Sequence, residues 1–362
     1  SRDQSLRFVP LTPASDKDGV NRMTSVWYDD ATEFYFVTCR NPAGVFMIDK
    51  KSGRIQPVQT DASGKRLPEC NLIKKVAGDI WLLTSSAVYR YHTTSGTFKP
   101  FPTPFDISGV QFTDVLQDAS GNIWFSTFGE GVFYYDARDK AFKRIITSTD
   151  TFLLRGATAL ERDISGQWMW VATYGSDLYR YHVQHNSMEV FSESLKHTLY
   201  KPLKLVNDLE TDHQGNVWAA THAGGVFTYS ERLKFFQPFD MMNGYRYNEY
   251  LALKKGKGNM LYLLSRKGVS YIDITKPQTE QVIPYLSAFS SFGSFAEVPH
   301  RMFYDVQENE LIVPVAGGLL FYNHEPQYPI EGFKIVADEV FAESGTIEMK
   351  DEGYFQLSLD HK

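Results

Sequence analysis

The sequence contains nine histidines, and histidine is the side chain most often used as a general base or a metal ligand. His182 and His185 are close in sequence, but no His-Glu-x-x-His pattern and no cysteine pair accompanies them. No Gly-x-Ser-x-Gly nucleophile motif and no Walker phosphate loop occurs either. We therefore predict no catalytic residue, no metal site and no cofactor.

Carboxylate pairs are the main alternative source of chemistry, because glycoside hydrolysis needs only two acids at the right distance in space. Most of the acidic residues that can be placed lie in turns that recur along the chain, and repeated positions build a scaffold. The acidic residues that break the repetition are Glu69, Asp106, Glu130, Asp177 and Glu249. A binding module is favoured, and a glycan-active hydrolase or lyase remains the alternative.

Another group of residues has the chemistry for binding a sugar. Aromatic faces can stack on the C–H surfaces of a pyranose, while Asn, His and Arg can bind its hydroxyls. Arginines also favour carboxylates or sulfates through bidentate hydrogen bonds. The predicted ligand-binding residues are Arg22, Arg40, Phe128, Arg155, Tyr174, His222, Asn248 and Arg266. For each of them taken singly, a solvated loop residue is the alternative.

The elements that must position these residues repeat along the chain. An aromatic or large apolar residue in the second strand of each copy recurs at intervals of 43 to 50 residues. The seven anchor residues are Phe36, Trp81, Trp124, Trp170, Trp218, Tyr262 and Ile312. A residue that recurs once per structural unit belongs to the core, so the tryptophans should pack between neighbouring units. The Trp124→Ala change is expected to cost about 3–5 kcal/mol.

Turn residues separate the strands of each copy. The third, fourth and fifth copies contain an Asp-x-x-Gly turn that starts at Asp118, Asp163 and Asp212, respectively. The aspartate can accept a hydrogen bond from the backbone N–H two residues later, and glycine takes positive φ without steric cost. A glycine-rich turn, an aromatic strand and a final short strand follow.

Seven copies of four short strands predict an all-β fold, a seven-bladed β-propeller of four-stranded blades. An open β-solenoid is the alternative architecture. The seventh copy lacks a last strand, and residues 6–10 precede the first copy as an unused strand. We predict that this N-terminal strand closes the last blade as its outermost strand. The propeller is assigned to residues 1–328. The residue pattern changes after this point, and residues 329–362 are assigned to a truncated β-sandwich segment.

Composition limits the remaining classes of function. The net charge of −6, with both signs scattered, gives no basic stripe for nucleic acid. Only Cys39 and Cys70 are present; a bridge between them is one option, and two buried free thiols are favoured. No run of about 18 apolar residues occurs that could span a bilayer.

The repeated phrase Asp-x-x-Gly-x-[Ile/Val/Leu]-Trp, followed by Thr, Gly and Tyr, resembles the two-component regulator propeller repeat. Residues 118–135 and 212–229 fit it throughout, and 163–181 fit with one inserted residue. The following segment, from Pro329 to Val336, resembles the start of the three-tyrosine (YYY) β-sandwich. The resemblance covers essentially the whole chain.

The resemblance implies the periplasmic sensor region of a Bacteroides-type hybrid histidine kinase and response regulator. Such regions detect glycan fragments and control polysaccharide utilisation. The chain would then be the periplasmic portion of an inner-membrane protein, with an oligosaccharide as ligand, and would not itself be an enzyme. The full-length protein is expected to form a homodimer, and its transmembrane helix and kinase are expected outside this chain. A protein-interaction scaffold of another membrane sensor, such as a diguanylate cyclase, is the other alternative.

Overall fold

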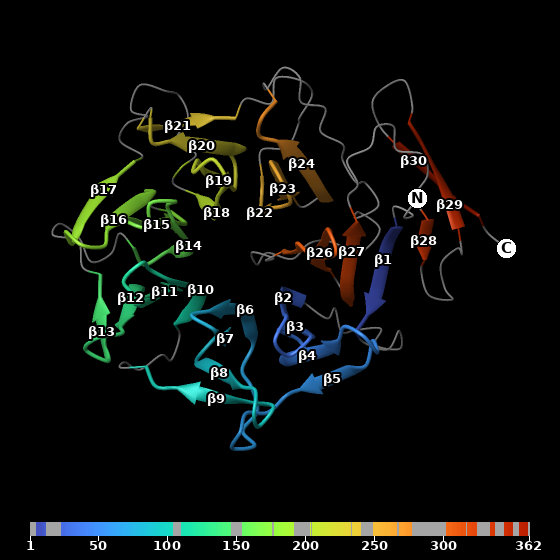
Figure 1. Cartoon of the computed structure of the whole chain (residues 1–362), viewed down its shortest axis with the longest axis horizontal. Helices are drawn as coiled ribbons and strands as arrows, with labels where there is room; N and C mark the ends of the chain where they lie inside the picture. Colours follow the sequence, from blue (N-terminus) through green and yellow to red (C-terminus); the bar gives the residue numbers. More distant parts are fainter. Residues whose placement is uncertain are drawn as a thin grey trace.

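The computed structural model is an all-β ring of blades around a central axis (Figure 1), and we call the axis-facing side of the innermost strands the channel. The strands are short because turn residues interrupt the chain every few positions, and the inner strands of each blade bury their β-branched and aromatic side chains against the next sheet. The described residues are 5–11, 23–103, 110–145, 154–175, 177–191, 203, 205–232, 234–239, 249–265, 268–276, 302–315, 317–323, 334–336, 344–349 and 355–360.

The first four blades are antiparallel sheets whose strands follow one another from the channel outward. Blade one contains β2 (Met23–Asp29), β3 (Phe34–Cys39), β4 (Gly44–Asp49) and β5 (Ile55–Val58). Blade two contains β6 (Cys70–Val76), β7 (Asp79–Thr84), β8 (Val88–His92) and β9 (Thr97–Phe101). Blade three contains β10 (Gln111–Gln117), β11 (Ile123–Phe128), β12 (Gly131–Asp136) and β13 (Ala141–Arg144). Blade four contains β14 (Ala157–Arg162), β15 (Trp168–Thr173), β16 (Tyr179–His182) and β17 (Ser187–Val190).

The last three blades complete the ring. Blade five contains β18 (Val206–Thr211), β19 (Val217–Thr221), β20 (Val226–Ser230) and β21 (Phe235–Pro238). Blade six has three strands among the described residues, β22 (Ala252–Lys255), β23 (Met260–Ser265) and β24 (Gly268–Asp273). Blade seven contains β25 (Phe303–Asp305), β26 (Glu310–Val315), β27 (Gly318–Asn323), β1 (Ser5–Pro10) and β28 (Lys334–Val336). The predicted seven-bladed propeller is confirmed.

The two ends of the propeller sequence meet in blade seven. Strand β1 pairs antiparallel with β27, and Leu11 N–H donates to the Gly317 carbonyl at 2.9 Å. The predicted N-terminal closure is therefore confirmed, but β1 is not the outermost strand, because β28 pairs parallel with its other edge. An uncovered β1 would present a row of unpaired backbone groups, and β28 occupies that edge.

The segment after the propeller forms two further strands. β29 (Ser344–Met349) and β30 (Phe355–Asp360) pair as an antiparallel hairpin (Figure 1). The division of the chain at residue 329 and the assignment of the last segment to a β-sandwich stay predictions.

The anchor residues form the core between blades, as predicted. The ring of Trp124 lies 5.4 Å from that of Tyr181 in the next blade, and Trp170 lies 4.8 Å from Tyr229 in the same way. All seven anchors are 4% exposed or less. Each blade is therefore held to its neighbour mainly by burial of large apolar side chains, which is the dominant favourable contribution to folding.

The Asp-x-x-Gly turns do more than reverse the chain. Asp118 accepts the backbone N–H of Ser120 at 2.8 Å, as expected, and its second carboxylate oxygen accepts the indole N–H of Trp124 at 2.8 Å. Asp212 and Trp218 repeat this contact at 2.7 Å. The turn aspartate therefore satisfies the one polar atom of the buried anchor, which a buried indole requires.

Both cysteines are free and buried, as favoured from the sequence. Burial raises the pKa of the Cys70 thiol to about 12, so the thiol stays protonated at physiological pH.

Candidate functional site

Two mouths of the central channel carry polar and aromatic side chains, at opposite ends of the innermost strands. The first mouth lies where the innermost strands begin and the second strands end. The other lies where the innermost strands end, at the Asp-x-x-Gly turns. We call the first the loop mouth and the second the turn mouth.

At the loop mouth, two aromatic side chains from neighbouring blades are exposed. Phe128 ends β11 and is 48% exposed, and Tyr174 follows β15 and is 41% exposed. Gly156 lies between them: it bridges to Phe128, and its carbonyl accepts the Tyr174 N–H at 2.8 Å. A side chain cannot replace this glycine without movement, because a Cβ there would lie 2.4 Å from the Tyr174 carbonyl oxygen. The backbone therefore fixes the spacing of the two aromatics.

The line of side chains continues into the fifth and sixth blades. The ring of His222 lies 5.8 Å from the Tyr174 ring in an edge-on arrangement. Its Nδ1 is 3.0 Å from Oε1 of Glu249, which comes from the connection into blade six. We call Phe128, Tyr174 and His222 the aromatic arc. It runs across three consecutive blades, so the structure brings three of the predicted binding residues together.

Arg155 is also exposed and precedes Gly156 directly. Its carbonyl accepts the N–H of Gly129, which places its backbone beside the turn that follows Phe128. Four of the eight predicted residues therefore lie in one part of the loop mouth. Arg22, Asn248 and Arg266 fall outside the described residues.

Arg40 has a different environment. Its Nε donates to Asn71 Oδ1 at 2.9 Å, and Asn71 in turn donates to the carbonyl of Phe112 in the next blade at 3.3 Å. Asn207 makes the same kind of link to Tyr250, at 2.7 Å. Arg40 therefore supports Asn71, whose side chain links the innermost strands of blades two and three. This contact is separate from the aromatic arc.

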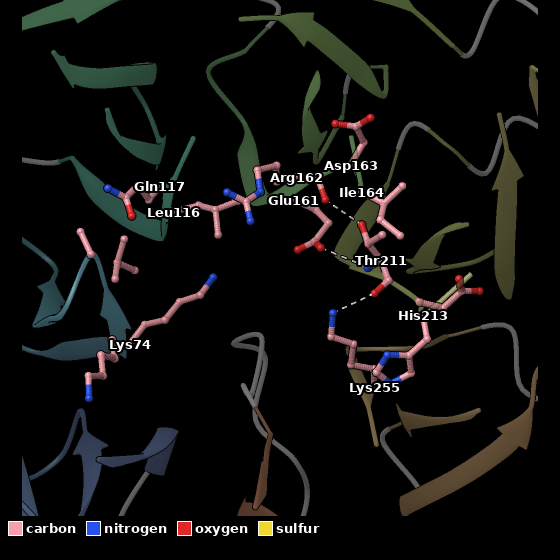
Figure 2. A pocket seen from close by; sticks show the side chains of 14 residues that line it. Lys74, Leu116, Gln117, Glu161, Arg162, Asp163, Ile164, Thr211, His213 and Lys255 are labelled. Carbon is pink, nitrogen blue, oxygen red and sulfur yellow. Dashed lines mark hydrogen bonds between the residues drawn. The ribbon is translucent and has the colours of Figure 1, made fainter. Parts of the chain in front are cut away.

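The turn mouth holds a hollow of about 470 Å³ (Figure 2). We call it the turn-side pocket. Figure 2 shows four charged side chains around it: Lys74 from β6, Glu161 and Arg162 from β14, and Lys255 from β22. The lining residues are Lys74, Lys75, Val76, Ala77, Leu116, Gln117, Glu161, Arg162, Asp163, Ile164, Thr211, Asp212, His213 and Lys255.

The sequence prediction did not include this pocket, although a signal for it exists. In every blade one residue of the innermost strand lies opposite the anchor in the sheet register. These seven residues are Trp27, Lys74, Leu116, Glu161, Glu210, Lys254 and Phe303. Four of the seven are charged, which is unusual for the centre of a fold and marks the channel side of blades two, four, five and six.

Among the acidic residues that lie opposite an anchor, Glu161 has the most strongly shifted pKa. It is half-buried, and its Oε1 accepts the Thr211 N–H at 3.1 Å. Burial raises the pKa of the Glu161 carboxyl to about 7, and the neighbouring Glu210 carboxylate adds to the rise. Lys74 and Lys254 act in the opposite direction, but each is already close to another carboxylate: Lys74 to Asp114 at 3.1 Å and Lys254 to Glu210 at 3.5 Å.

These two mouths differ in what they can do. The aromatic arc offers exposed ring faces and a His–carboxylate pair, which suit a ligand with C–H surfaces and hydroxyls. The turn-side pocket is lined mainly by charged and polar groups, and the ring that it contains is that of His213. Among the described residues, no three His, Cys, Asp or Glu side chains gather as metal ligands. The described part of the chain also contains no helix long and apolar enough to cross a membrane.

Comparison with known proteins identifies the fold. No family description and no curated protein matches the chain. Among solved structures, the extracellular domain of a putative hybrid two-component system from B. thetaiotaomicron matches with a TM-score of 0.70 at 16% identity, over 97% of this chain and 48% of that one. The extracellular domain of a putative one-component system from the same organism matches with a TM-score of 0.64 at 18% identity, over 92% and 44%. The chain thus spans about half the length of these two extracellular domains.

An enzyme has the same fold. A catalytically inactive virginiamycin B lyase from Staphylococcus aureus, with quinupristin, matches with a TM-score of 0.65 at 11% identity, over 88% of this chain and 98% of that one. At such identities, likeness to the sensors and to the lyase establishes the propeller alone. The choice between them depends on the side chains at the two mouths.

Proposed function

We propose that this chain is the extracytoplasmic ligand-sensing region of a hybrid histidine kinase that controls polysaccharide utilisation, and that an oligosaccharide binds on the aromatic arc. The observation that carries the proposal is the exposure of Phe128 and Tyr174, 48% and 41%, beside each other on the loop mouth. The anchors of the same strands, Trp124 and Trp170, are 1% and 0% exposed. The strands therefore bury their anchor tryptophans but leave Phe128 and Tyr174 exposed at the loop mouth, where blades three and four meet.

The chemistry of the arc fits a sugar. Aromatic rings provide a large apolar contact at low cost in side-chain entropy. The pair of His222 and Glu249 supplies a donor and an acceptor for hydroxyls at one end of the arc. The exposed Arg155 would add a bidentate partner for a carboxylate or sulfate, so an acidic oligosaccharide is favoured.

The placement outside the cytoplasm rests on the likeness to extracellular domains of sensors. The chain would be the periplasmic portion of an inner-membrane protein, whose kinase lies in another part of the polypeptide. A homodimer of the full-length protein would carry the signal, because histidine kinases act between subunits.

Calorimetric titration with a panel of neutral and acidic oligosaccharides tests the proposal. The double change Phe128→Ala and Tyr174→Ala removes two ring faces, each contributing about 0.5–1.5 kcal/mol, so binding should weaken about fivefold or more. Phe235→Ala is the matched control, because Phe235 is 40% exposed on the outer strand β21, away from the channel. Equal affinity of the double variant and the parent would refute the site. Arg155→Ala should weaken only the acidic ligands.

A lyase is the second candidate, favoured by one contact. His222 and Glu249 form a His–carboxylate pair at the loop mouth, the arrangement that a general base requires. Turnover of a bound glycan by the parent, abolished in His222→Ala, would establish an enzyme and remove the sensor assignment. Unchanged glycan after prolonged incubation with the parent favours the sensor.

A further inference from the structure

The turn-side pocket lies at the opposite end of the innermost strands from the aromatic arc and has its own chemistry (Figure 2). Its volume of about 470 Å³ is that of a site for a small molecule. Innermost strands of five blades, the second to the sixth, contribute to its wall, so its shape depends on the closed ring.

The acidic side chains of the pocket wall are largely committed to the fold. Asp212 accepts two backbone N–H groups and the indole of Trp218. Asp163 accepts the N–H of Trp168 at 2.9 Å and binds Ser165 in its own turn. Neither carboxylate is directed to a cation of the pocket, so both serve as turn caps.

Two cations of the wall have no carboxylate partner in the part of the chain that the structure describes. Lys255 donates to the Thr211 carbonyl at 3.2 Å, which is a neutral acceptor. Arg162 is exposed and makes no ion pair with a described residue. Lys74 and Lys75, by contrast, are paired with Asp114 and Asp29. The pocket therefore presents one guanidinium and one ammonium with unused capacity for an anion.

We propose that the turn-side pocket binds a small ligand that carries a carboxylate, and that Arg162 and Lys255 pair with that group. Arginine matches the planar geometry of a carboxylate, and lysine adds a second positive charge. This site is separate from the aromatic arc and goes beyond the proposed function. Both a sugar acid released from a glycan and a free organic acid carry the required group.

Glu161 controls the charge of the pocket. In Figure 2 its carboxyl is drawn between the guanidinium of Arg162 and the ammonium of Lys255, and it has a pKa of about 7 because of burial and the nearby Glu210. The ionisable groups that surround it from neighbouring strands are Lys74, Asp114, Glu210, Lys254 and Lys255, and His213 also lines the pocket. As an anion Glu161 repels a carboxylate, and as a neutral acid it can donate a hydrogen bond to one. Binding should therefore strengthen as the pH falls through 7.

Titration of the folded protein with sodium glucuronate and sodium lactate at pH 6 and pH 8, followed by calorimetry, tests the proposal. Neither probe changes its own charge in this interval, because ordinary carboxyl pKa values lie near 4. If only the neutral form of Glu161 is competent, the apparent affinity at pH 6 should be about tenfold that at pH 8. Glu161→Gln should bind with similar affinity at both pH values.

The charge contribution is tested by the double change Arg162→Gln and Lys255→Gln, which should abolish binding of both probes. The control is Arg138→Gln with Lys140→Gln, which removes the same charge from an exposed turn of blade three and should leave binding unchanged. Thermal unfolding confirms that each variant is folded.

Stronger binding of glucuronate assigns a sugar acid as the ligand, and stronger binding of lactate assigns a free acid. The proposal is overturned if neither probe binds at pH 6, if the pocket double variant binds like the parent, or if cationic glucosamine binds better than either acid. These outcomes are independent of the Phe128 and Tyr174 variants, which change the other mouth of the channel.

Discussion

The turn aspartate Asp118 is the side chain whose removal should have the clearest effect on stability. It is 3% exposed, and its carboxylate accepts four hydrogen bonds: from Ser120 N at 2.8 Å, Asn122 N and Asn122 Nδ2 at 2.9 Å, and Trp124 Nε1 at 2.8 Å. Asp118→Ala removes all four acceptor contacts and leaves the buried indole N–H of Trp124 unpaired.

Blade four supplies an internal control. Its turn has one more residue between the aspartate and the anchor, so Asp163 binds the Trp168 N–H at 2.9 Å and the buried Nε1 of Trp170 has no hydrogen-bond partner in the described structure. Leaving a buried donor unsatisfied costs about 1–3 kcal/mol, and each lost turn bond about 1 kcal/mol. Each variant loses three turn bonds, about 3 kcal/mol in sum, and only Asp118→Ala also leaves an indole unsatisfied. We therefore expect Asp118→Ala to lower the free energy of unfolding by about 1–3 kcal/mol more than Asp163→Ala does.

Urea unfolding followed by far-ultraviolet circular dichroism measures both losses. An unchanged dependence on urea concentration for each variant, with a shifted midpoint, makes the two free energies comparable. Equal losses for Asp118→Ala and Asp163→Ala would refute the reasoning, since the indole contact is the difference between the two turns.

Three further outcomes follow from the same structure. Deletion of residues 1–12 removes β1 and uncovers the edge of β27, so the melting temperature should fall sharply in a thermal scan; an unchanged value would exclude the closure. Gly156→Ala places a Cβ 2.4 Å from the Tyr174 carbonyl, so it should lower stability and weaken glycan binding together, whereas loss of neither would mean that the backbone there can shift freely. Glu161 has a folded-state pKa of about 7, above the ordinary value of 4.5, so the folded protein binds more protons than the unfolded chain between these values and loses stability as the pH rises through them. Glu161→Gln should therefore unfold at a higher temperature than the parent at pH 8 and show no such advantage at pH 4; a parent whose stability rises from pH 5 to pH 7 relative to Glu161→Gln would contradict the shift.

The repeat made most of the fold predictable. Each blade is a local unit in which Asp, Gly and large aromatics recur at fixed positions, and a local pattern needs no knowledge of distant contacts. The same periodicity identified the anchors as core, located the missing strand of blade seven at the N-terminus, and indicated Asp118 as a turn residue. It did not indicate that β28 would pair with the other edge of β1, because pairing between distant segments leaves no spacing signal.

The site was predictable only in part, and the reason is geometric. Phe128, Tyr174 and His222 were named from the loops that they occupy, but their alignment into one arc depends on Gly156 and on the angle between successive blades. Arg40 has the residue type of a ligand contact, yet a neighbouring asparagine from the next blade binds it.

The turn-side pocket depended wholly on the tertiary structure. In the sequence, Lys74, Glu161 and Lys255 are tens of residues apart and look like ordinary charged positions in short strands. Ring closure brings their strands around one axis, where burial and the nearby Glu210 raise the pKa of Glu161. The order of the residues along the chain determined the blades, because strands and turns form from near neighbours; the convergence of charges in the channel was decided by closure, because it joins positions that only the complete ring brings together.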